Sequence, residues 1–398
     1  MKKIENIFIW TSIIFLIGIV GFFSYRFIHY YRLSHNRDVI NNDLYEIILD
    51  NRAILNLRKV DNSYYYTENN GNNYVIYSGI LWRIIKLENN KLTLISDVPV
   101  TNLYYDDVLD YLNNEFYNLL DNRLIVDTET CINSDEKNEC IEKYTNKVLL
   151  LSLDNYDIVG GINSYINNGY FTYLMSNLYV NDSGKISDIN GNDLYGIKPV
   201  ITINSTDILN GSGTKNNPYI LDRAVTNLKD ALIGSYVSFS NKTFRIMENN
   251  DYAKLILDDV IPYELSISKY ENSNLYNYLN DTFYNSLDID NLITSDWYSG
   301  YFDNDYSEIQ KEKINCNVVI ANIGDMFIND QNNYILMSTP RLLETMYVIK
   351  NNGIIYEENN LKDFGVRPVF KIKNDLKITG DGTKNSPYIV GENNEDKN

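Results

Sequence analysis

The residue types that most often carry catalysis are scarce in this 398-residue chain. Its two histidines, His29 and His35, lie near the N-terminus, and no histidine follows residue 38. A histidine-free body cannot hold a Ser-His-Asp or Cys-His nucleophile, nor a zinc ion bound by histidine. We therefore expect neither a catalytic residue nor a cofactor in the body of the chain.

Three cysteines remain as candidates for chemistry. Cys131 and Cys140 flank a polar loop, and a disulfide closing it would stabilise the fold by roughly 2–3 kcal/mol. Two free thiols are the alternative interpretation. Cys316 precedes an apolar strand and is expected to be a buried single thiol.

Acidic residues could supply a different chemistry. They cluster at 106–107, 258–259 and 303–305, and a glycosidase needs two carboxylates facing one bond. No spacing pairs these acids, so solvated faces are the favoured interpretation. Asp and Asn oxygens in the long loops could bind calcium, but no EF-hand pattern supports it. We expect no metal-ligating residue.

The segment 211–215 (GSGTK) superficially resembles a phosphate-binding loop. It lacks the full pattern of such a loop and precedes a strand instead of a helix. It also returns in the second half of the chain, which indicates a structural turn.

Clusters of aromatic residues are the remaining candidates, because Tyr and Trp serve both ligand contacts and ordinary cores. If exposed, they would form different surfaces in the two halves of the chain. These residues are Tyr104, Tyr105, Tyr165, Tyr170, Phe171 and Tyr173, followed by Trp297, Tyr298, Tyr301 and Phe302.

The composition limits the classes of function. Lys and Arg total 35 against 53 Asp and Glu, a formal charge of −18, which argues against a nucleic-acid partner. Hydrophobic residues make up 44% and charged residues 22%, so the chain can build sizeable cores.

The segment 7–28 begins with an apolar run long enough to cross a bilayer. A buried helix and a cleaved signal peptide are the alternatives, but no small-residue cleavage site follows. The acidic body and the cysteine pair favour an exterior location. We predict a membrane partner through 7–28, and a single-pass cell-membrane protein with extracellular C-terminal domains.

The rest of the chain contains an internal repeat. Residues 195–200 (YGIKPV) return as 364–369 (FGVRPV), and 211–221 return as 380–390 at the same offset of 169. Earlier matches have smaller offsets: 162 near Arg83 and Arg245, and 167 at the Tyr-Leu-Asn of 111–113. The offset of 162 also places Asp97 on Asp259.

Positions that recur between the copies are expected to serve the fold. Arg83, Arg245 and Arg367 recur, with Lys198 as the fourth cation, and each should meet a carboxylate or a carbonyl. The full set of repeat positions is Trp82, Arg83, Gly196, Pro199, Gly211, Gly213, Pro218, Phe244, Arg245, Gly365, Arg367, Pro368, Gly380, Gly382 and Pro387.

The sequence predicts mixed strands and few helices as the elements that position these residues. Apolar periodicity predicts a helix over 108–120 and a helical stalk within 39–57. We predict an α+β fold, divided into a transmembrane anchor (1–37), a helical stalk (38–62), two repeats (63–222 and 232–391) and a polar tail (392–398).

The order of these motifs, from W-R-I to G-x-G-T-K-x-x-P-Y, resembles a bacterial family of domains of unknown function, found in tandem in surface proteins of low-GC Gram-positive bacteria. That family is similar to the C-type-lectin-like superfamily, in its formylglycine-generating-enzyme-like branch. The resemblance covers both repeats and implies two lectin-like domains.

The chain departs from the active members of that superfamily. It has no Glu-Pro-Asn or Trp-Asn-Asp calcium motif, and neither closing region contains a cysteine. Fold alone implies no function. We expect a cell-surface protein that binds a glycan, a wall polymer or a protein without catalysis. A carboxylate-dependent hydrolase of envelope polysaccharide and a passive envelope scaffold are the alternatives.

Overall fold

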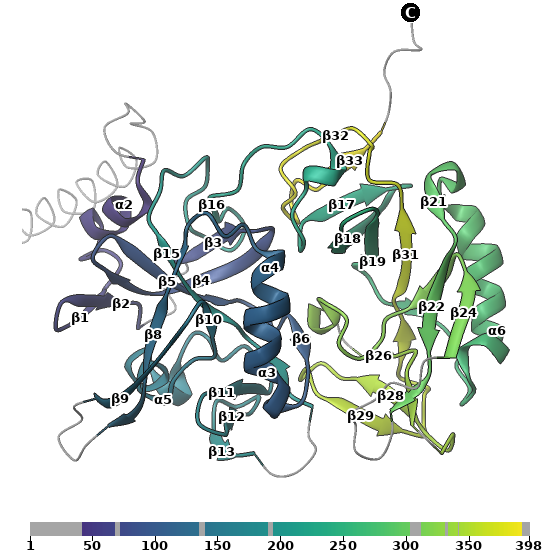
Figure 1. Cartoon of the computed structure of the whole chain (residues 1–398), viewed down its shortest axis with the longest axis horizontal. Helices are drawn as coiled ribbons and strands as arrows, with labels where there is room; N and C mark the ends of the chain where they lie inside the picture. Colours follow the sequence, from purple (N-terminus) through teal and green to yellow (C-terminus); the bar gives the residue numbers. More distant parts are fainter. Residues whose placement is uncertain are drawn as a thin grey trace, which may run out of the picture. The chain divides into compact units, whose positions relative to one another are not determined.

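The computed structural model describes residues 42–67, 72–134, 140–189, 194–302, 312–330, 333–340 and 342–391. Residues from Asp43 onward form one compact unit, which is described by itself. β-Sheets dominate it, and its helices are short (Figure 1).

The first half holds two sheets. A nine-stranded sheet has the order β1-β2-β4-β5-β15-β10. Strand β3 also pairs with β4, β16 pairs with β3, and β7 pairs with β15. A five-stranded sheet has the order β13-β12-β11-β14-β6. The strands are β1 (Arg58–Val60), β2 (Ser63–Tyr65), β3 (Tyr74–Tyr77), β4 (Ile80–Glu88), β5 (Lys91–Ser96), β6 (Thr101–Asn102), β7 (Ile125–Val126), β10 (Val148–Leu149), β11 (Thr172–Leu174), β12 (Leu178–Val180), β13 (Ile186–Asp188), β14 (Gly196–Ile197), β15 (Val200–Asn204) and β16 (Tyr219–Ile220).

The second half holds a matching pair of sheets. An eight-stranded sheet has the order β21-β31-β19-β18-β17-β33-β32, with β25 paired to β31, and a five-stranded sheet has the order β20-β30-β26-β28-β29. The strands are β17 (Tyr236–Phe239), β18 (Lys242–Asn249), β19 (Ala253–Leu257), β20 (Ile261–Pro262), β21 (Leu292–Ile293), β25 (Val318–Ile320), β26 (Tyr334–Ile335), β28 (Met346–Ile349), β29 (Ile355–Glu358), β30 (Gly365–Val366), β31 (Pro368–Ile372), β32 (Ile378–Thr379) and β33 (Tyr388–Val390).

The pairing patterns of the two halves correspond in the strands of the repeat, whereas β1 and β2 of the first half have no counterpart among the described strands of the second. The antiparallel strands β3-β4-β5-β15 of the first half pair in the same order as β17-β18-β19-β31 of the second. Strands β16 and β33 each pair in parallel with the outer strand, β3 or β17. The smaller sheets correspond as well, with β6 in the position of β20 and β11 in that of β26. The sequence repeat therefore coincides with a repeated topology.

Three two-stranded sheets and short helical segments complete the unit. The remaining strands are β8 (Thr128–Ser134) with β9 (Cys140–Asn146), β22 (Ser295–Ser299) with β24 (Glu312–Cys316), and β23 (Tyr301–Phe302) with β27 (Thr339–Pro340). The helical segments are α2 (Leu44–Asp50), α3 (Tyr105–Tyr111), η1 (Leu112–Phe116), α4 (Tyr117–Leu119), α5 (Leu153–Ile158), η2 (Gly161–Asn163), η3 (Leu228–Asp230), η4 (Tyr270–Asn272), α6 (Asn274–Asn277), η5 (Tyr278–Phe283), η6 (Tyr284–Ser286), η7 (Ile289–Asn291) and η8 (Ile328–Asp330).

The helix predicted over 108–120 is present as the continuous run α3-η1-α4. Its apolar face is buried, with Val108, Leu112 and Phe116 all fully enclosed. The turn in the middle is a π-helix, and η5 repeats it in the second half. At these turns Asn113 and Asn280 each bond both the N–H and the C=O of a strand valine, Val148 or Val318, so the asparagine ties the helix to the sheet.

The expected α+β class with a helical stalk is wrong, because the described chain is mainly β-sheet. Among the described residues of the predicted stalk, only Leu44–Asp50 is helical, and the chain then turns into strand β1. Asp43 caps the helix, and Leu44 and Ile48 are fully buried in the core. Tertiary contacts therefore make this segment part of the globular unit.

The prediction of a single-pass membrane protein is likewise corrected. Within the part of the chain that the structure describes, no helix has both the length and the apolar character needed to cross a bilayer. The segment 7–28, on which that prediction rested, lies outside the described residues.

A segment of the second half packs directly on the first half. The Phe327 N–H donates to the Val100 carbonyl at 2.7 Å, and the Thr101 hydroxyl donates to the Asp325 carbonyl at 3.0 Å. The buried Asn102 amide donates to the Gly353 carbonyl at 2.7 Å and accepts from Asn329. These bonds cover the β6 edge of the first half with the connection that follows β25.

Candidate functional site

The repeated cations form two equivalent buried clusters. In the first half, Arg83 donates to the Tyr74 hydroxyl at 2.8 Å and lies 3.6 Å from the Asp97 carboxylate. The exposed Lys215 of the GSGTK segment reaches the same carboxylate at 3.2 Å. Its ammonium group also lies over the Tyr74 ring.

The second half repeats this arrangement with Tyr236, Arg245, Asp258 and Lys384. Lys384 pairs with the buried Asp258 at 2.9 Å and lies over the Tyr236 ring. Arg245 lies over the same ring and pairs with Asp330. The acid that corresponds to Asp97 is therefore Asp258, not Asp259 as the sequence offset predicted.

The glycines of the two repeated loops explain why these segments are structural turns. Gly211 and Gly380 have φ of +108° and +105°. A β-carbon at Gly211 would overlap the Pro218 carbonyl oxygen, and one at Gly380 would overlap the Pro387 carbonyl oxygen. The carbonyl oxygens of Gly213 and Gly382 accept the N–H groups of Tyr74 and Tyr236. Each loop therefore holds the equivalent strand of its own half in place, β3 in the first and β17 in the second.

The second pair of repeat cations, Lys198 and Arg367, holds the connections between sheets. The fully buried Arg367 donates to the carbonyls of Leu257 and Phe327 at 2.8 and 3.0 Å. Lys198 donates to the Ile166 carbonyl at 3.0 Å. The expectation that the repeat cations meet a carboxylate or a carbonyl is confirmed. Burial lowers the pKa of Lys198 to about 8, although Asp97 nearby opposes the shift.

The other repeat positions also lie inside the fold. Trp82 and Phe244 are fully buried in β4 and β18, and the Trp82 indole donates to the Tyr77 carbonyl. A β-carbon at Gly196 or Gly365 would meet Pro99 or Val260. Pro199 immediately precedes strand β15, and Pro368 is the first residue of strand β31.

The cysteines lie in two different settings. Cys131 in β8 is disulfide-bonded, whereas the side chain of Cys140 in β9 lies outside the described residues. Cys316 is a free, buried thiol, and burial raises its pKa to about 12. It is therefore held in the unreactive protonated form.

Most of the candidate aromatic residues do not form an exposed surface. Tyr165, Tyr173 and Trp297 are buried. Phe171 stacks within a cluster with Tyr179 and Tyr195. Tyr298 is exposed, and the side chains of Tyr301 and Phe302 lie outside the described residues.

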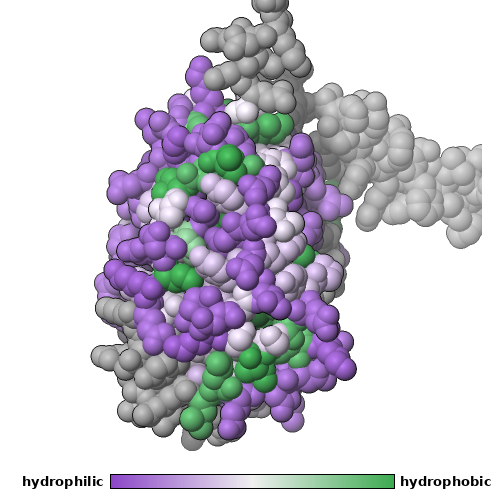
Figure 2. Space-filling model, turned by 90° about the vertical axis from the view of Figure 1, so that its right-hand side faces the viewer, coloured by the Kyte–Doolittle hydropathy of each residue, from purple (hydrophilic) through white to green (hydrophobic). Residues whose placement is uncertain are grey.

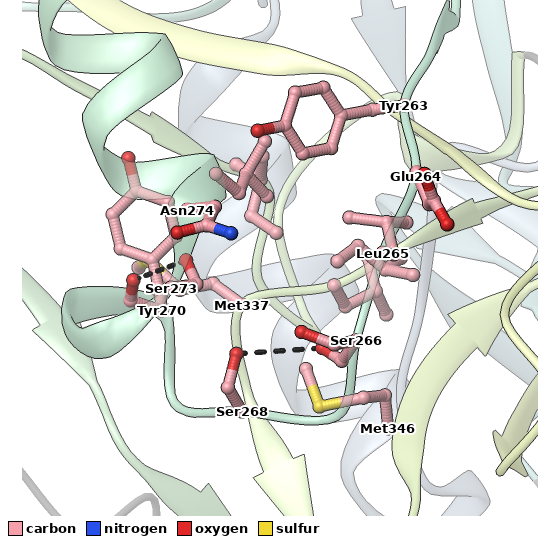
Figure 3. A pocket seen from close by; sticks show the side chains of 14 residues that line it. Tyr263, Glu264, Leu265, Ser266, Ser268, Tyr270, Ser273, Asn274, Met337 and Met346 are labelled. Carbon is pink, nitrogen blue, oxygen red and sulfur yellow. Dashed lines mark hydrogen bonds between the residues drawn. The ribbon is translucent and has the colours of Figure 1, made fainter.

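A pocket in the second half, which the sequence analysis missed, is the best candidate site (Figure 3). Its cavity volume is about 40 Å³, well below the roughly 300–1,000 Å³ typical of pockets that enclose a whole ligand, and part of it is open to solvent. Fourteen residues line it: Tyr263, Glu264, Leu265, Ser266, Ser268, Tyr270, Ser273, Asn274, Leu275, Ile320, Ile335, Leu336, Met337 and Met346.

The pocket combines an apolar floor with a polar rim. The floor is made of buried side chains from β25, from β26 and the residues directly after it, and from β28, including Ile335, Met337 and Met346. The rim carries hydroxyl and amide groups, among them Ser266 and Asn274 (Figure 3). Such a pocket suits a ligand with an apolar body and a polar end.

Hydrogen bonds fix one wall of the pocket. The Tyr270 hydroxyl donates to the Val318 carbonyl at 2.5 Å, and Ser273 donates to the Tyr270 carbonyl at 2.6 Å while capping α6. Burial raises the pKa of Tyr270 well above its ordinary value, so this phenol stays a neutral donor. The wall is therefore preorganised.

A longer connection in the second half builds the rim. Leu103 and Tyr111 of the first half are 8 positions apart, whereas their counterparts Tyr263 and Tyr278 are 15 apart. The sequence contains part of the signal of this insertion, because the repeat offset rises from 162 near Arg83 to 167 at Tyr111. Strand register shows the full seven residues, since the offset is 160 at Leu103 and Tyr263.

A second hollow adjoins the pocket and shares Tyr270 and Met337 with it. Glu271 and Glu312 both line this hollow. Glu312 pairs with Lys269 at 2.7 Å, whereas one buried oxygen of Glu271 has no hydrogen-bond partner among the described residues. Across the described ranges, no cluster of three or more metal-ligating side chains occurs.

Comparisons of the chain with family models, curated proteins and solved structures find no match. The resemblance to a family of tandem surface domains therefore stays a prediction, and the function is argued from the site alone.

Proposed function

We propose that the chain is a non-catalytic binding protein whose second half holds a protein or glycan ligand in the pocket beside Tyr270. The observation that carries the proposal is the construction of this pocket. A connection that is seven residues longer in the second half than in the first surrounds an apolar floor with hydroxyl groups. The first half, which has no such insertion, serves as its structural counterpart.

The chemistry of the lining supports binding. Glu264 is the single carboxylate among the residues that line the pocket, and hydrolysis between two carboxylates requires a pair facing one bond. The repeat cations nearby are engaged with carboxylates and carbonyls of the fold. The pocket thus offers contact area and hydrogen bonds.

The face that carries α6, β22 and β24 supports a localised site. Figure 2 shows this face largely covered by hydrophilic residues, with hydrophobic residues in separate areas. A large flat association surface would need a continuous apolar area. Recognition is therefore expected to centre on a pocket.

The proposal is tested by covering the mouth of the pocket. Ser266 is exposed at the rim, so Ser266→Trp places an indole over the opening, and Ser183→Trp is a matched control on an exposed turn of the first half. We expect the intact chain and the control to capture the same ligand from glycan arrays and from pull-downs, and Ser266→Trp to lose at least tenfold in affinity. Equal capture by both variants would contradict the proposal.

The second candidate function is hydrolysis by Glu271 and Glu312, because both carboxylates line the adjoining hollow. Turnover of a cell-envelope polysaccharide by the intact chain, abolished in Glu271→Gln and in Glu312→Gln, would favour this function over binding. The ion pair between Lys269 and Glu312 keeps one of the two carboxylates engaged, which is why binding is preferred.

A further inference from the structure

We infer that the pocket of the second half receives an aromatic side chain of a partner polypeptide, with a tyrosine ring as the best fit. This inference rests on the proposed binding function and names the chemical class of its ligand. It comes from the equivalent position in the first half, where a tyrosine of the chain itself fills the corresponding space.

The strand register identifies equivalent positions in the two halves. Thr172 of β11 pairs with Gly196, as Tyr334 of β26 pairs with Gly365, so Tyr173 corresponds to Ile335. The neighbouring strands β12 and β28 pair with β11 and β26 in the same way, which equates Asn177 with Met346. Ile335 and Met346 both line the pocket.

In the first half, Tyr105 lies over these two equivalent positions. Its ring packs edge to face on Tyr173, with the centroids 5.3 Å apart. Its hydroxyl accepts the Asn177 N–H at 2.9 Å. A phenol ring with a polar end therefore occupies, in the first half, the space that is a pocket in the second.

The second half leaves this space open because of its longer connection. Tyr105 lies six residues before Tyr111, and Asn272 lies six residues before the equivalent Tyr278. Asn272 therefore takes the position of Tyr105, and it is exposed. Tyr263 does not fill the space either, because its ring packs against Tyr278 with the centroids 5.0 Å apart. In Figure 3, Tyr263 borders the pocket on the side of Asn274.

The lining suits a phenol ring on a polypeptide. The thioethers of Met337 and Met346 are adaptable partners for an aromatic ring, with contacts worth roughly 0.3–1.5 kcal/mol. The hydroxyl of Ser266 and the amide of Asn274 can bond a phenol oxygen at the rim. A sugar ring would leave its many hydroxyls against this apolar floor without partners.

Methionine methyl groups report on the pocket directly, because the chain has only six methionines. We propose ¹³C-methyl methionine spectra of the full chain, with Met337→Leu and Met346→Leu used for assignment. N-acetyl-tyrosinamide should shift both signals in a saturable manner. N-acetyl-leucinamide should bind at least tenfold more weakly, and N-acetylglucosamine should leave the signals unchanged.

The reciprocal experiment opens the equivalent space in the first half. Tyr105→Ala should create a second site for N-acetyl-tyrosinamide, detected at the methyl of Met175, which corresponds to Met337. Tyr105→Phe keeps the ring and is the matched control, for which no second site is expected. If Tyr105→Ala does not fold, the measurement on the wild-type pocket still decides the inference.

Two results would overturn the inference. Shifts caused by N-acetylglucosamine but not by N-acetyl-tyrosinamide would assign the pocket to glycans, leaving the proposed binding function intact. Absence of any shift with the aromatic probe would exclude a tyrosine site. A ligand captured by the intact chain and lost in Ser266→Trp would then still support binding, so the two proposals fail separately.

Discussion

At the scale of single residues, the buried cations are the most informative feature. Arg83, Arg245 and Arg367 lie almost wholly inside the protein, and guanidinium nitrogens of each are bonded to carboxylates, carbonyls or a phenol. Nη2 of Arg367 is buried without a hydrogen-bond partner among the described residues. Removing one partner of a buried polar pair leaves the other unsatisfied. These residues therefore stabilise the fold and are not available to a ligand.

Arg367→Ala is expected to lower the free energy of unfolding by about 2–5 kcal/mol, because two buried carbonyls lose their donor at about 1–3 kcal/mol each. Urea denaturation would measure the loss. Arg367→Lys should recover part of it, since Lys198 serves the equivalent place in the first half. An unchanged stability together with a loss of ligand binding would show that the arginine acts at a site.

Lys198 should make stability depend on pH. Its folded pKa of about 8 lies below the ordinary value of 10.5, so between these values the unfolded chain binds more protons and stability rises with pH. The rise should be on the order of 2 kcal/mol from pH 8 to 10, since one pKa unit corresponds to about 1.4 kcal/mol. Urea midpoints over this range should rise for the wild type and for Lys229→Met, whose lysine is exposed, relative to Lys198→Met. The comparison is relative because buried tyrosines with raised pKa values lower the stability of all three proteins alike towards pH 10.

At the scale of elements, sequence periodicity succeeded where the helix is continuous and failed where tertiary contacts interrupt it. The helix predicted over 108–120 is present over 105–119, because its apolar stripe faces the sheet throughout. The predicted helix over 39–57 ends at Asp50, since the following residues turn and then pair as β1 with β2. The same stripe of apolar residues is compatible with both outcomes.

The repeated glycine loops allow a test at this scale. Gly211→Ala should cost about 2 kcal/mol or more, because its φ of +108° is strained for alanine and the new β-carbon meets the Pro218 carbonyl. Gly169→Ala is the matched control, with a φ of +89° and no atom within 4 Å of the added carbon. Thermal denaturation of both variants separates the cost of the steric overlap with Pro218 from the cost of backbone strain. Equal losses of stability in the two variants would show that the overlap contributes nothing.

At the scale of the whole molecule, the two halves are joined by specific buried hydrogen bonds. Asn102 donates to the carbonyls of Leu194 and Gly353, one from each half, and also accepts from Asn329. In the second half the position of Asn102 is taken by Pro262, whose side chain has no amide to donate or accept these hydrogen bonds. The same contact is therefore not available at Pro262.

Asn102→Ala should weaken the coupling between the halves. We expect calorimetry to show one cooperative transition for the wild type, and a lower, broadened or divided transition for the variant, with a loss of about 2–4 kcal/mol from the unsatisfied buried groups. Asn118→Ala, at an exposed position of α4, is the control and should retain the wild-type transition. Two separate transitions in the wild type would contradict a coupling through Asn102.

The duplication can be recognised from the amino-acid sequence because certain positions recur between the copies. Glycines with positive φ and buried cations recur, since few other residues can replace them. The absence of histidine from the body and the acidic charge are likewise properties of the chain itself. Folding alone decides which acid meets Arg245, how the halves join, and where the pocket lies. These features depend on strand register and on a seven-residue difference in one connection, which local patterns do not encode, because they arise from contacts between residues far apart in the sequence.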